Sequence, residues 1–145
     1  MKEKKTVEFV WSVVVNLLVL AAVNTFPLWR HLTNGIVLPT WGKVLWAMNS
    51  TGGVTILGNL LLAYYRPPRL RFFFEMFFDA AAFVSTLVFY LVFPLDFSRI
   101  PGDWLNTLIK AFLIMGMCAA AIAFIVHFVR FLRGDRPAAA GERET

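Results

Sequence analysis

The chain has a single cysteine, Cys118, and it lies in the middle of an apolar run. One thiol can form no intramolecular disulfide, no paired thiolate ligands for a metal and no redox motif. Histidine is almost as scarce, with only His31 and His127. His31 falls in a predicted loop, so a haem held by two membrane-embedded histidines is excluded. The sequence therefore predicts no metal site and no cofactor.

Charged residues are also few. Charged residues make up 16% of the chain and hydrophobic residues 59%, whereas soluble domains carry about 25% charged residues. A soluble fold of this size cannot hide so much apolar surface, but lipid can cover it. The net charge of +5 comes from basic residues between apolar runs, which is typical of topology signals and not of a nucleic-acid interface.

Motifs of catalysis are missing as well. The sequence contains no phosphate-binding loop, no G-x-S-x-G turn and no paired nucleophile and base. No enzymatic activity is predicted.

Four apolar runs are long enough to cross a bilayer, which takes about 20 residues each. They cover residues 7–29, 44–65, 72–95 and 104–132. The sequence thus predicts an all-α integral membrane protein, a four-helix transmembrane bundle forming one domain over residues 1–133. The polar remainder, 134–145, is predicted to be a disordered tail.

Helix boundaries are suggested by residues that break or cap helices. Thr40 is a candidate N-cap for the second span, and Asp103 for the fourth. The stretch "RPPRLR" at 66–71 predicts a tight hinge, because adjacent prolines cannot continue the preceding helix. Its arginines also form a candidate site for lipid headgroups, namely Arg66, Arg69 and Arg71.

The distribution of Lys and Arg predicts the orientation of the spans. One side holds ten basic residues: Lys2, Lys4, Lys5, Arg66, Arg69, Arg71, Arg130, Arg133, Arg136 and Arg143. The other side holds Arg30, Lys43 and Arg99, and Lys110 if it reaches the surface. Both termini are therefore predicted to be cytosolic, in a multi-pass protein of the cell membrane, of the prokaryotic plasma-membrane type. The imbalance argues against a dual-topology dimer. Aromatic anchors are expected at both interfaces. Those of the outer side are Trp29, Trp41, Trp46 and Trp104, and those of the inner side are Trp11, Tyr64 and Tyr65.

An alternative interpretation exists for the first run. "MKEKK" followed by apolar residues also resembles a cleaved signal peptide. The run reaches full spanning length and "AAVNT" is a poor cleavage site, which favours a retained span. Three remaining spans would still fit the charges.

Two acids interrupt the apolar run "RFFFEMFFDAAAF". Glu75 and Asp79 share a helix face at i and i+4, about 6 Å and 12 Å along the helix from Arg71. His127 lies about 4.5 Å from Arg130 on the next span, at the level of Glu75. We expect a contact between Glu75 and His127, with Arg130 as a second partner.

Asp79 needs a partner of its own, because an ionised Asp at membrane depth costs about 2.5–3.5 kcal/mol on insertion scales. Asn16 and Asn59 lie at suitable depths and are the predicted partners. Asn49 and Lys110, both nearer the outer side, form a second candidate cluster.

The motif "NSTGG" at 49–53 has two interpretations. Adjacent glycines can break a span and expose carbonyls to an ion, as in transporters. They also allow two helices to pack closely, which is the favoured interpretation.

Two classes of function follow. The first is an accessory or helix-interaction protein whose polar stripes pack against each other or against a partner, either a second copy or another membrane protein. The second is an oligomeric channel or transporter protomer for protons or small cations that uses Glu75 and Asp79.

Overall fold

The computed structural model describes residues 2–26, 28, 35–65, 67–98 and 104–134, and this part of the chain is entirely helical apart from turns and one isolated backbone bridge. The prediction of an all-α chain with four long helices is confirmed. The elements are α1 (Lys2–Thr25), a short 3₁₀ turn η2 (Pro39–Trp41), α2 (Gly42–Tyr64), α3 (Pro68–Val92) and α4 (Trp104–Arg133).

The bounds of α3 differ slightly from the predicted 72–95. The helix starts at Pro68, because proline fits the first helical position, where its missing N–H leaves nothing unpaired. It ends where Phe93 adopts a left-handed conformation with φ 36° and donates its N–H to the carbonyl of Phe89 at 2.8 Å. Pro94 follows and cannot continue the helix.

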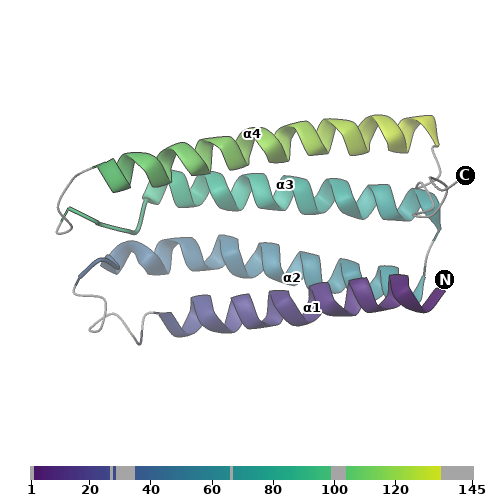
Figure 1. Ribbon diagram of the computed structural model, residues 1–145, viewed down its shortest axis with the longest axis horizontal. Coiled ribbons are helices and arrows are strands. Elements are labelled where there is room, and N and C mark those ends of the chain that lie inside the picture. The colour runs from purple at the N-terminus through teal and green to yellow at the C-terminus, as the bar shows by residue number, and fades with distance from the viewer. Residues whose placement is uncertain (1, 27, 29–34, 66, 99–103, 135–145) are drawn as a thin grey trace, which may run out of the picture.

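The four helices form an open, up-and-down arrangement. Consecutive helices run antiparallel and pack in chain order, α1 on α2, α2 on α3 and α3 on α4 (Figure 1). Within the described residues, α1 and α4 are not a packed pair, so they form the two edges of a row. Polar contacts between the helices accordingly join chain neighbours, as between Asn24 and Asn49, Thr51 and Ala81, and Asp79 and His127.

The two long connections meet at one end of the row. The N–H of Leu38 donates to the carbonyl of Pro94 at 2.9 Å, and the N–H of Asp96 donates to the carbonyl of Ile36 at 2.8 Å. These two hydrogen bonds pair backbone groups of the two loops that would otherwise lack a partner within the chain. They join the α1–α2 half of the chain to the α3–α4 half.

Trp41 packs beneath this junction and is the largest residue in the small buried core. Its ring lies 4.9 Å from Phe26 and 5.9 Å, edge-on, from Phe89, measured between centroids. Its indole N–H donates to the carbonyl of Val23 at 3.2 Å. The ring fills the space where α1, α2 and α3 converge and is only 7% exposed, so Trp41 has little surface with which to contact a membrane interface.

Thr40 does not cap α2, contrary to prediction. The turn Pro39–Trp41 leads directly into the helix, so the residue before α2 is Trp41, without a side-chain cap. The Thr40 hydroxyl is buried with no hydrogen-bond partner among the described residues. The other predicted cap, Asp103, lies outside the described residues.

Glycines on α2 allow close packing on both sides. The helix is continuous through Gly52 and Gly53, which contradicts a broken span and supports the packing interpretation of "NSTGG". A methyl group at Gly52 would lie 2.6 Å from the side chain of Leu20 on α1. A methyl group at Gly58 would overlap the ring of Phe78 on α3, whereas Gly53 has open space around it.

Two helices are long and apolar enough to cross a membrane, over Arg69–Val92 and Trp104–Arg133. The apolar part of α1 is shorter, Phe9–Thr25. In α2 the polar and glycine residues at 49–53 and 58–59 interrupt the apolar sequence, so this helix has no stretch as long and as apolar as those of α3 and α4.

Gly58 provides a test of the seam between α2 and α3. Replacing Gly58 with Ala is expected to lower the free energy of unfolding by about 1–3 kcal/mol, the usual cost of overpacking, since the new methyl group meets Phe78. The measurement is reversible unfolding in mixed micelles. Gly53→Ala is the matched control and should be neutral or stabilising by up to about 1 kcal/mol, because alanine favours helix. Equal effects of the two substitutions would contradict the packing described.

Candidate functional site

A cluster of ionisable side chains joins α3 to α4. The Nδ1 atom of His127 lies 2.6 Å from Oδ2 of Asp79, and its Nε2 atom lies 3.4 Å from Oε2 of Glu75. The Nε atom of Arg71 donates to Oε1 of Glu75 at 2.7 Å. Arg71, Glu75, His127 and Asp79 thus form a continuous chain of contacts, the carboxylate–imidazole cluster.

Helical geometry explains why three members of the cluster come from one helix. Residues four apart on α3 lie one above the other, so Arg71, Glu75 and Asp79 form a single stripe along its side. The two carboxylates are far enough apart for an imidazole from α4 to sit between them. His127 lies near the C-terminal end of α4, level with the start of α3, because the two helices are antiparallel neighbours.

The side chains of the cluster are partly buried. The side chains of His127 and Glu75 are each 22% exposed and that of Asp79 is 19% exposed, while Arg71 is 40% exposed. The buried ring of Phe72 lies against the imidazole, with 6.4 Å between ring centroids. The polar end of the cluster is therefore the Arg71 end, and the contacts become less exposed toward Asp79.

The expected contact between Glu75 and His127 is present in the structure, but two partners differ from expectation. Arg71, on the same helix, pairs with Glu75. Arg130, expected as the second partner, makes no ion pair with any described residue. The i and i+4 spacing of Arg71 and Glu75 was visible in the sequence and would have identified this pair.

Asp79 bonds to His127 and not to Asn16 or Asn59. The side chain of Asn16 donates to the Ser12 carbonyl at 2.8 Å. The buried Asn59 donates to the Thr55 carbonyl, also at 2.8 Å. Both amides are thus satisfied within their own helices.

The physical reason lies in the faces of α3. The side that meets α2 carries Phe74 and Phe78, which pack on Gly58. Adjacent helical residues point about 100° apart, so Glu75 and Asp79 are turned away from α2 and toward α4.

The second predicted cluster does not form. Asn49 on α2 pairs with Asn24 on α1 through two amide hydrogen bonds of 2.6 Å and 3.0 Å. Lys110 lies over the ring of Phe93, with its Nζ atom 4.7 Å from the ring centroid. Since α4 does not pack on α2 among the described residues, Lys110 cannot reach Asn49. In the predicted spans 7–29 and 44–65, Asn24 and Asn49 each lie five positions from the span end at the connecting loop, so the sequence could have suggested this pair.

The predicted headgroup arginines remain a prediction. Arg69 and Arg71 lie in the first turn of α3, and Arg66 lies outside the described residues. The guanidinium of Arg69 reaches Gly134 at the end of α4, where an added methyl group would lie 3.3 Å from it. Arg71 is paired with Glu75, so its guanidinium is less available to a lipid phosphate than that of Arg69.

The geometry determines which chemistry the cluster can perform. The two carboxylates contact opposite nitrogens of one imidazole, so the three side chains do not converge on a common point. Accordingly, no group of three metal-ligating side chains suited to a metal ion occurs in the described part of the chain. What the arrangement can do is share and hold protons along a line of hydrogen-bonding groups.

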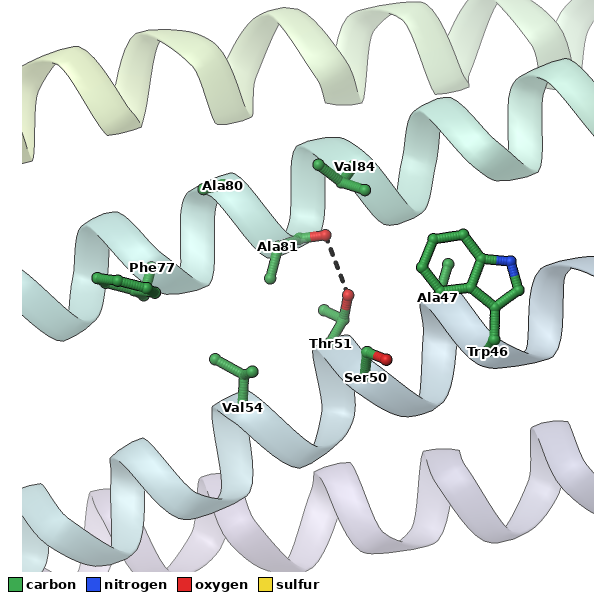
Figure 2. Close-up of a pocket in the computed structure, with 9 residues that line it drawn as sticks. All are labelled: Trp46, Ala47, Ser50, Thr51, Val54, Phe77, Ala80, Ala81 and Val84. Atoms are coloured by element: carbon green, nitrogen blue, oxygen red, sulfur yellow. Dashed lines mark hydrogen bonds between the residues drawn. The ribbon is translucent and has the colours of Figure 1, made fainter.

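A separate groove lies between α2 and α3 and is apolar. It has a volume of about 280 Å³ and is lined by Trp46 and Phe77 among others (Figure 2). The hydroxyl of Thr51 donates to the carbonyl of Ala81 at 3.0 Å and so crosses this seam (Figure 2). The other polar groups of the lining are the hydroxyl of Ser50 and the indole N–H of Trp46 (Figure 2).

No family model, curated protein or solved structure matches this chain.

Proposed function

We propose that the chain is a multi-pass membrane protein in which all four helices cross the bilayer, with both termini in the cytosol. The helices contain 24, 23, 25 and 30 residues, so each is about 34–45 Å long, more than the hydrocarbon thickness of about 30 Å. The two helices that are long and apolar enough to cross a membrane, α3 and α4, bury almost none of their residues within the chain. A core helix of a soluble protein would be mostly buried.

Its role in the membrane is that of an accessory or helix-interaction protein. The observation that supports this role is the open row, because α4 has a full side without an intramolecular partner and none of its residues is buried. That side presents apolar residues at helical spacing, including Met115, Cys118 and Ile122, all exposed. The opposite edge, α1, exposes Trp11 and Leu18 in the same way. Such edges suit lateral association with a second copy or with helices of another membrane protein.

Cysteine labelling tests the four crossings. In a Cys118→Ser background, Leu28→Cys and Ser98→Cys should both react with an impermeant maleimide added to intact cells. Arg69→Cys should react only after permeabilisation, because the hinge is predicted to be cytosolic. If only α3 and α4 crossed the bilayer, Ser98→Cys would be labelled and Leu28→Cys would be protected, and the four-span proposal would be wrong.

Oxidative cross-linking tests self-association along α4. With Cys118 at the middle of the free side of α4, oxidation of membranes should give a covalent dimer if copies meet there. Cys118→Ser should abolish the dimer. Leu18→Cys in the Cys118→Ser background applies the same test to the edge formed by α1. If neither cysteine gives a dimer at any protein density, self-association through the edges is contradicted and the partner must be another protein.

The carboxylate–imidazole cluster favours a second candidate function, an oligomeric protomer that conducts protons or small cations. The supporting observation is the line of contacts from the exposed Arg71 to the more sheltered Asp79. An open row encloses no pathway in one chain, so conduction would require several copies.

Flux through proteoliposomes separates the two candidates. If the second one holds, purified protein should carry protons or cations, and Asp79→Asn should abolish the flux while Asn16→Ala, which lies outside the cluster, should preserve it. Absence of flux in the wild type under proton, sodium and potassium gradients would remove the second candidate and leave the first. Flux that persists in both Asp79→Asn and Glu75→Gln would exclude the acids from the mechanism.

A further inference from the structure

We infer that the carboxylate–imidazole cluster is a proton-binding site. It holds one proton more than it would hold if both carboxylates were ionised and the imidazole were neutral. A neutral imidazole has one N–H and one lone pair. With Asp79 at one ring nitrogen and Glu75 at the other, the lone pair of a neutral ring would face an ionised carboxylate. That arrangement places two acceptors against each other and leaves one contact repulsive.

Two arrangements remove this repulsion, and both contain the same number of protons. In the first, the imidazole of His127 carries both N–H groups and donates to each carboxylate. In the second, the ring is neutral and one carboxylic acid donates to it. Either way, two protons are shared among His127, Glu75 and Asp79.

The shorter contact is the one to Asp79. The distance of 2.6 Å between Nδ1 of His127 and Oδ2 of Asp79 is that of a strong hydrogen bond, and it fits both arrangements, because a protonated ring donating to a carboxylate and a carboxylic acid donating to the ring both give short contacts. The contact of 3.4 Å between Nε2 and Glu75 is longer, and Glu75 also accepts from Arg71. Asp79, by contrast, has His127 as its ion-pair partner among the described residues, and it therefore depends more on the extra proton.

Charge balance supports the same count. With the extra proton, the formal charges of Arg71, Glu75, His127 and Asp79 sum to zero, and without it they sum to −1. Partly sheltered groups in an apolar setting favour neutrality, because an uncompensated charge there loses its hydration. The number of protons follows from the two contacts of the imidazole alone, whereas the preference for a net charge of zero also depends on the proposed membrane location.

Other charged groups on the packed helices do not replace the proton. On α4, Arg130 is exposed and makes no ion pair with a described residue. On α2, the charged residue is Lys43, at the opposite end of the row, and Tyr64 and Tyr65 at the near end are exposed. Within the described residues, Arg71 is thus the cation that pairs with the carboxylates besides a protonated His127.

The bound proton also links α3 to α4. Losing it turns one of the two contacts of His127 from attractive to repulsive and weakens the seam. The inference deepens the second candidate function by naming where a proton binds, but it holds whether or not ions cross the membrane.

Nitrogen NMR tests the inference directly, because the chain has only two histidines. In protein labelled with ¹⁵N-histidine, His31→Gln leaves His127 as the single imidazole observed. Near neutral pH in lipid nanodiscs, the spectrum is expected to show both ring nitrogens protonated. In Asp79→Asn the doubly protonated signal should be lost, because the carboxylate that pairs with the second N–H is gone.

Infrared spectroscopy covers the alternative placement of the same proton. A protonated carboxyl band that disappears in Asp79→Asn or Glu75→Gln would also support the site, with the proton on the acid. A singly protonated ring in the wild type together with two ionised carboxylates would overturn the inference. Because the wild type gives the decisive result, the test does not depend on the folding of a variant, and it is independent of any flux measurement.

Discussion

Contact between His127 and the two carboxylates of α3 gives α4 a defined position in the row. No residue of α4 is buried. In the proposed membrane location, an apolar helix gains little from hydrophobic association, since lipid tails are as apolar as its side chains. Apolar contacts alone would let α4 slide or rotate against α3. The hydrogen bond of 2.6 Å to Asp79 and the contact of 3.4 Å to Glu75 determine both its depth and its rotation.

Each of the other two seams has a polar contact of a different kind. Asn24 and Asn49 form a reciprocal amide pair between α1 and α2, and Thr51 bonds to the backbone of Ala81 between α2 and α3. Hydrogen bonds between membrane helices contribute about 0.6 kcal/mol on average. Contacts of this size add little to total stability. Their effect is to select one register for each pair of helices, because a shifted helix would leave a polar group unpaired.

Much of the fold could be predicted from the sequence because it depends on local signals. Apolar length, the prolines at 67–68 and the breakers at 94 and 101 locate the helices within a few residues. The level of Glu75 relative to His127 follows from counting residues along two antiparallel neighbours. Rotation about the helix axis could not be predicted in the same way. Whether Asp79 points to α2 or to α4 depends on where Phe78 packs, and the pocket for Phe78 is provided by Gly58 on another helix.

The same dependence explains why the contacts of Trp41 and Asn16 could not be predicted. A tryptophan near a span end is typical of the membrane interface, but Trp41 packs against Phe26 and Phe89 beneath the junction between the two loops, and no local pattern reveals that junction. Asn16 carries an amide that its own helix can satisfy through the Ser12 carbonyl. An aspartate has no donor when ionised and so cannot bond to a helix carbonyl. Glu75 takes a donor from its own helix, Arg71, but the α3 residues three and four positions from Asp79 carry no basic or amide side chain. Asp79 therefore pairs with His127 on another helix, and this contact determines how α3 and α4 are joined.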